Sequence, residues 1–130
     1  ERNDTSFDKI GTGMSESSGI FTFPSTGIYL VSTRTFYYLN GDSRYNEIVI
    51  RLSTDGGSGY SSIAYGYTSI SNNTSNTTYA NASTEAMIDV TNTSNFRVAV
   101  SVTHGDTNTT VAGNSGSNNN ATTFIRLGDT

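Results

Sequence analysis

The chain has 130 residues, which is the size of one domain, and a formal net charge of −4 at pH 7. This acidic balance disfavours a nucleic-acid partner, because binding to phosphates requires a basic surface. Hydrophobic residues make up only 33% of the chain and charged residues 14%, and Ser, Thr, Asn and Gly fill the remainder. Such a mixture suits strands joined by turns and suits helices poorly, since Ser, Thr and Asn compete with the helical backbone for hydrogen bonds.

Residues 18–31 predict a short strand, a tight turn and a longer strand. The turn contains Pro24, the only proline in the chain, which cannot donate to a sheet ladder and therefore belongs between strands. The strand that follows, Ile28–Leu39, has apolar or aromatic side chains at both odd and even positions. One of its faces can fill a core, and the other must meet something else, such as a neighbouring subunit.

The remainder of the chain alternates between apolar segments and turn residues. Strands are predicted at Glu47–Leu52, Tyr60–Ile70, around Ala86–Val90, at Phe96–Val102 and at Thr122–Leu127, with a weak short strand near Val111–Ala112. Asn40-Gly41 is a strong turn signal between the first two long strands. A succession of strands without a helical pattern implies an all-β sandwich, barrel or jelly roll.

The spacing of Phe21, Gly27 and Tyr29 resembles the C1q/TNF-like signature, in which an aromatic precedes a Gly-x-Tyr strand. The chain departs from that signature at Lys9, Met14, Val31 and Thr33. Phe124, in a Thr-Thr-aromatic strand close to the last residue, is similar to the closing strand of such domains. The resemblance implies an all-β, antiparallel two-sheet jelly-roll sandwich that forms a homotrimer. It also implies a first strand before Asp4–Phe7, which can lie upstream of this chain.

Three phrases near the ends, residues 10–15, 21–27 and 124–129, also resemble C1q-like structural proteins of marine bacteriophages. This narrower resemblance implies a virion structural protein on the particle surface. Residues 1–130 would then form a single domain, the C-terminal trimeric head of a longer chain in a fibre or appendage. Its expected partners are itself, other virion proteins, and a host-surface glycan or protein.

Three alternatives to this function stay open. They are a capsid-decorating or trimerisation module without a receptor role, a secreted C1q-like recognition lectin, and a carbohydrate depolymerase. The absence of cysteine fits assembly in a reducing cytoplasm and favours association over disulfides as a source of stability. No apolar run approaches the ~20 residues of a membrane span, so no membrane insertion is expected.

Residues able to perform catalysis are sparse. His104 is the only histidine, and although Asp106 could complete a Ser-His-Asp triad, no Gly-x-Ser-x-Gly elbow is present. The carboxylates that a glycosidase would need could come from Glu47, Glu85 and Asp89, which are better interpreted as solvated strand positions. We therefore expect no enzymatic activity.

No cofactor is expected either, with calcium as the minor alternative. The two segments that could supply oxygen ligands are Asp55–Ser58 and Asp106–Asn108, and both are more typical of ordinary turns than of a dedicated calcium loop.

Recognition of a ligand is expected to lie in two long polar loops, Ser71–Ala80 and His104–Ala121, which are too polar for a core. The candidate ligand-binding residues are Asn73, Asn76, Tyr79, His104, Asp106, Asn108 and Asn114. Tyr29, Tyr37 and Tyr65 are predicted to lie in the core or at a subunit interface. For Tyr60 and Tyr79 a ligand-binding role and a packing role stay equally open.

Overall fold

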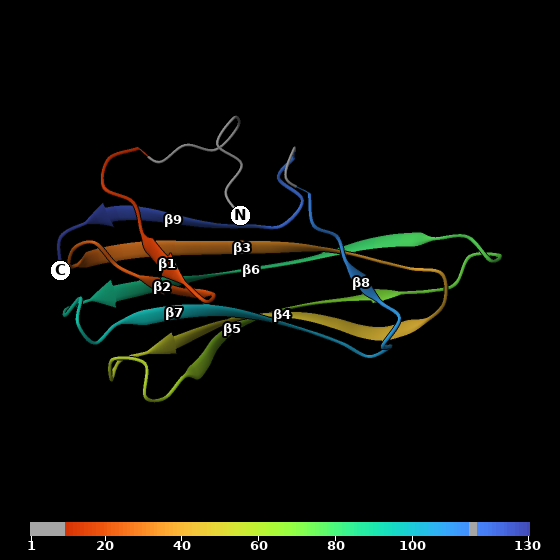
Figure 1. The fold of residues 1–130 in the computed structure, drawn as a ribbon, viewed down its shortest axis with the longest axis horizontal. Coiled ribbons are helices and arrows are strands. Elements are labelled where there is room, and N and C mark those ends of the chain that lie inside the picture. Colours follow the sequence, from red (N-terminus) through yellow and green to blue (C-terminus); the bar gives the residue numbers. More distant parts are fainter. Residues whose placement is uncertain (1–9, 115–116) are drawn as a thin grey trace.

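The computed structural model describes residues 10–114 and 117–130, which form two antiparallel β-sheets and no helix (Figure 1). The first strand implied before Asp4–Phe7 therefore lies outside the described residues. Within them, no helix is long and apolar enough to cross a membrane.

One sheet has five strands and the other is built around the long strand β3. The five-stranded sheet has the order β1 (Ser15–Ser17), β2 (Ile20–Thr22), β7 (Arg97–His104), β4 (Ser43–Ser53) and β5 (Ser61–Ile70). In the second sheet, β6 (Thr78–Val90) pairs with one edge of β3 (Gly27–Leu39), and β8 (Thr110–Val111) and β9 (Ala121–Gly128) share the other edge. The chain crosses repeatedly between the sheets, as in a jelly roll.

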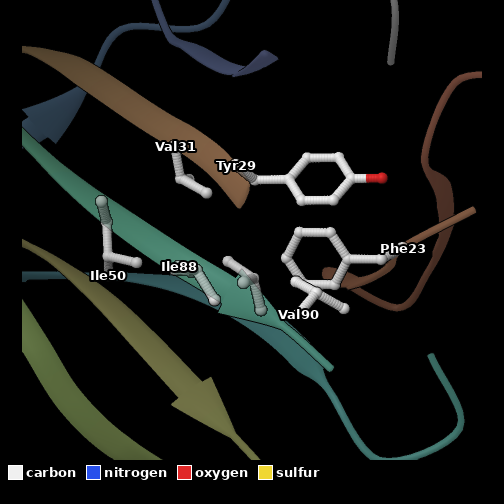
Figure 2. Packing of buried hydrophobic residues seen from close by; sticks show 7 residues of the cluster. Phe23, Tyr29, Val31, Ile50, Ile88 and Val90 are labelled. Carbon is white, nitrogen blue, oxygen red and sulfur yellow. The ribbon is translucent and has the colours of Figure 1, made fainter. Parts of the chain in front are cut away.

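The core lies between the two sheets and follows the alternation of β3. The odd-numbered residues of β3 point inward and are buried, among them Tyr29, Val31, Tyr37 and Leu39, whereas its even-numbered residues are partly or fully exposed. Two clusters fill the interior. The first contains Phe23, Tyr29, Val31, Ile50, Ile88, Val90 and Val98 (Figure 2). The second contains Tyr37, Leu39, Ile48, Ile70 and Ala82.

The aromatic residues of the signature close one end of the first cluster. The ring centroids of Phe23 and Tyr29 are 4.8 Å apart, and those of Phe21 and Phe124 are 5.0 Å apart. The Tyr29 hydroxyl donates a hydrogen bond to the carbonyl oxygen of Ser25 at 3.0 Å, so its polar end is satisfied at the turn. This arrangement links the first turn to the first and last long strands.

Thr33 stands where the signature usually has an aromatic residue, and it is buried. Its hydroxyl lies 2.9 Å from that of Thr122 and 3.2 Å from the Ala121 carbonyl oxygen, both on β9. A polar contact with the neighbouring strand therefore replaces aromatic packing at this position.

The sandwich closes along its side where β5 of one sheet meets β6 of the other. Gly66 on β5 is buried, and a Cβ atom there would overlap the carbonyl oxygen of Ser83 on β6. Only glycine leaves room for this backbone approach.

Strand β6 differs most from its prediction, because it begins at Thr78 rather than near Ala86. It pairs with β3 over the whole length of that strand, from Gly27 opposite Val90 to Leu39 opposite Thr78. Tyr79 and Ala80 therefore belong to a strand and not to the predicted loop. The short strand β1 was also not predicted.

Two large side chains are exposed rather than buried in the core. Tyr65, predicted to lie in the core or at a subunit interface, is not in the core, since it is 52% exposed on the outer side of β5, and its position at an interface stays a prediction. Val102 lies on the same side of β7 as the buried Val98, but it is 41% exposed.

Candidate functional site

Two surfaces of the sandwich carry features that its folding does not require. We call the first the open face, which is the outer side of the sheet formed by β6, β3 and β9. We call the second the loop end, which consists of the connections 40–42, 71–77 and 105–109 at one end of the sandwich (Figure 1).

The open face carries exposed apolar side chains at both of its ends. At one end Leu30 lies between its ladder partners Met87 and Ile125, which are 68% and 47% exposed. At the other end Tyr38 lies opposite Tyr79, with ring centroids 5.9 Å apart. Side chains of this size are rarely left in water in such rows unless another surface covers them.

Between these ends the open face is polar. Arg34 on β3 and Glu85 on β6 are offset by two residues in the register, since Arg34 pairs with Ser83 and Ser32 with Glu85. The Arg34 guanidinium donates to the carbonyl oxygen of Asn118 at 2.7 Å, on the β9 side of the face. Next to it is a shallow hollow, whose lining on this face consists of Ser32, Arg34, Ser83, Asn118, Ala121 and Thr123.

Hydrogen bonds tie connection 40–42 to connection 71–77, and connection 105–109 to the start of β4. Asn40 donates through Nδ2 to the Ser75 carbonyl oxygen at 3.1 Å, and Asp42 accepts from the Asn72 backbone N–H at 2.6 Å. The backbone N–H of Gly105 donates to the Tyr45 carbonyl oxygen at 2.8 Å. The structure therefore brings residues 71–77 of one predicted polar loop and residues 105–109 of the other to one end of the fold.

Asn73 and Asn76 close the turn at the tip of the β5–β6 connection. The two residues form a bridge, and Thr74 and Ser75 between them have φ angles of 49° and 61°. Two consecutive left-handed residues are typical of the type I′ hairpin turn. This tip presents both asparagines at the surface.

The other candidate ligand-binding residues lie on different parts of the fold. Asp106 accepts two hydrogen bonds from Asn108, so these residues form a local turn. Tyr79 lies on the open face, and Asn114 follows β8 by three residues. His104, at the end of β7, pairs with the fully buried Asn46.

A hollow at the loop end was missed by the sequence analysis. It is lined by Asp42, Arg44, Tyr45 and Gly105. Arg44 and Tyr45 lie in the first residues of β4, which the sequence analysis placed before its predicted strand. Their only signal in the sequence is that they follow the Asn40-Gly41 turn.

The interior beneath the loop end is polar. Asn46 Nδ2, His104 Nδ1 and Thr109 Oγ1 are buried, and within the described residues they have no hydrogen-bond partner. The buried Tyr37 hydroxyl donates to the Glu47 carbonyl oxygen at 2.6 Å. Burial, with a smaller contribution from the Glu47 charge, raises the pKa of Tyr37 to about 12, so this donor persists into alkaline conditions.

The carboxylates considered for glycoside hydrolysis do not converge. Glu47 lies on the outer side of the five-stranded sheet, where its hydrogen bond with the Tyr67 hydroxyl raises the pKa of that tyrosine. Glu85 and Asp89 lie on the opposite sheet, four residues apart along β6, which corresponds to about 13 Å. A glycosidase needs two carboxyl groups about 5–10 Å apart across one cleft.

The residues considered for a Ser-His-Asp triad and for a calcium site are also not assembled into a site within the described residues. In a Ser-His-Asp triad the Nδ1–H of the histidine donates to the aspartate carboxylate. His104 Nδ1 has no hydrogen-bond partner among the described residues, and Asp106 accepts from Asn108 instead. Asp55 accepts from the Ser53 hydroxyl and the Gly59 N–H, which lowers its pKa and makes it a turn residue. Among residues 10–114 and 117–130, no three His, Asp or Glu side chains gather where they could hold a metal ion.

The architecture defines an antiparallel jelly roll, and comparison with solved structures specifies its type. Eiger TNF from S. frugiperda superposes with a TM-score of 0.66 over 90% of this chain and 70% of that chain, at 18% sequence identity. The predicted TNF-like, two-sheet jelly-roll fold is therefore confirmed. No protein-family model and no curated protein sequence matches the chain.

Proposed function

We propose that this chain is a non-enzymatic recognition module that works as a homotrimer, the head of a virion fibre or appendage. Three copies join through the open face and present their loop ends to a glycan or protein on the host surface. The observation that carries the proposal is the open face itself, whose two ends expose apolar rows. Covering such a surface with a second copy removes it from water.

The loop end is the part of each copy that would meet a ligand. It holds asparagine side chains at the Asn73–Asn76 tip and the hollow beside Asp42 and Arg44. Three such ends on one particle can bind together, so weak individual contacts add through avidity. The virion setting rests on the resemblance of residues 10–15, 21–27 and 124–129 to phage structural proteins and on the absence of cysteine.

Leu30→Asp is expected to convert the assembly into monomers, because it places a carboxylate in the apolar row formed with Met87 and Ile125. Analytical ultracentrifugation at micromolar concentration measures the mass. Ile63→Asp is the matched control, since Ile63 is a 39%-exposed apolar residue on β5 of the other sheet, and it should leave the trimer intact. A wild-type chain that sediments as a folded monomer would contradict the proposed trimer.

Shortening the loop end is expected to abolish adsorption to host cells without unfolding the protein. In one variant residues 71–77 become an Asn-Gly turn, and in another residues 105–109 do. The control shortens the turn 54–59, which joins β4 to β5 at the other end of the sandwich (Figure 1). If both loop-end variants adsorb as the wild type does, recognition lies elsewhere and the domain acts as a decoration or trimerisation module.

A further inference from the structure

The polar belt between the two apolar ends of the open face carries one positive and one negative side chain. Arg34 comes from β3 and Glu85 from β6, and both are exposed. The only ion pair among the described residues joins Arg126 to Asp129, so neither Arg34 nor Glu85 is ion-paired with another residue of that part of the chain. This holds although they lie on adjacent strands, offset by only two residues in the register.

The two charges are held toward different sides of the face. The Arg34 guanidinium is bonded to Asn118, on the side of β9, whereas Glu85 is on β6, the strand at the other edge of this sheet. The guanidinium has five N–H donors and uses one of them in this bond, so most of its donors stay available.

Assembly through the apolar ends would also enclose the belt that lies between them. A guanidinium or a carboxylate that leaves water without a partner of opposite charge destabilises the complex. A second copy of the chain brings both charges to the interface. The hollow beside Arg34, with the hydroxyl groups of Ser32, Ser83 and Thr123, provides a polar place for an incoming carboxylate.

We propose that Glu85 of one copy enters this hollow and pairs with Arg34 of the neighbouring copy. The pair fixes how the open faces of neighbouring copies align, and the apolar ends supply most of the affinity. The inference rests on the proposed function, because it takes the open face to be the surface of assembly.

Charge reversal tests the pair. Arg34→Glu and Glu85→Arg each place like charges opposite one another, and each is expected to raise the dissociation constant of the assembly at least tenfold in analytical ultracentrifugation. The double variant restores opposite charges and is expected to return within about threefold of the wild type. Arg51→Glu, at an exposed position on β4 of the other sheet, makes the same change in charge as Arg34→Glu and should leave the constant unchanged.

The outcomes separate this inference from the proposed function. If the wild type assembles and both single reversals assemble equally well, the ion pair is wrong and the trimer stands. The pair is also wrong if the double variant dissociates as readily as the single variants. If the wild type is a folded monomer, the proposed assembly fails and the pair fails with it. Far-UV circular dichroism verifies that every variant keeps its β-sheet structure.

Discussion

Tyr29→Ala is expected to lower the free energy of unfolding by about 3–5 kcal/mol, the usual cost of removing a buried aromatic ring. The ring is 3% exposed and packs edge-on against Phe23 at 4.8 Å. Domains of this size are stable by only about 5–15 kcal/mol, so the loss is a large share of the total. Urea denaturation at a fixed protein concentration measures it, because dissociation of an oligomer would also shift the midpoint.

Tyr29→Phe separates the ring from its hydroxyl. It keeps the packing and removes the hydrogen bond to the Ser25 carbonyl oxygen, which costs about 0.5–1.5 kcal/mol. The alanine variant should therefore be much less stable than the phenylalanine variant. Equal stability of the two would show that the hydroxyl contact, and not ring burial, is what Tyr29 contributes.

The strand pattern was predictable wherever one face of a strand is apolar. Ile48 and Ile50 share one face of β4 and are both fully buried, while Glu47 and Arg51 on the opposite face are polar. The apolar side chains on both faces of Ile28–Leu39 also follow from the structure. The odd-numbered residues fill the core, and the even-numbered residues form part of the open face. Alternation reports burial directly, and these elements were therefore predicted correctly.

The first half of β6 could not be predicted, because its partner and not its own composition makes it a strand. Residues 78–85 are mostly Thr, Ala, Asn and Ser, which are also common in loops. Hydrogen bonds to β3 and burial of the small Ala82 hold this segment extended. Tyr79 was consequently assigned to a loop although it faces outward from a sheet.

The candidate site was predictable only in outline. Long polar segments indicated where recognition loops lie, but not that Asp42 and Asn40 would tie one of them to the β3–β4 turn. The hollow beside Arg44 depends on the close approach of Gly105 to Tyr45, residues 60 positions apart in the sequence. Such contacts follow from topology, and no local pattern in the sequence encodes them.

The contacts between Gly27 and the last strand, β9, explain why the signature has a glycine at this position. Gly27 begins β3 with a φ of 140°, a left-handed value that residues with a side chain rarely adopt. A Cβ atom there would lie 2.5 Å from the carbonyl oxygen of Gly128 and 2.7 Å from Nε of Arg126. The same Arg126 donates to the Thr26 carbonyl oxygen at 3.1 Å, so the turn and the closing strand meet at this residue.

Gly27→Ala is therefore expected to destabilise the fold by about 2–5 kcal/mol, through backbone strain and steric overlap together. Gly113→Ala is the matched control, because a Cβ atom at Gly113 would meet nothing within 4 Å and its φ is not left-handed. Thermal denaturation gives the melting temperatures of both variants and of the wild type for comparison. A melting temperature for Gly27→Ala equal to that of Gly113→Ala would mean that β9 can move away from the turn without loss. The signature glycine would then have no role in docking the last strand.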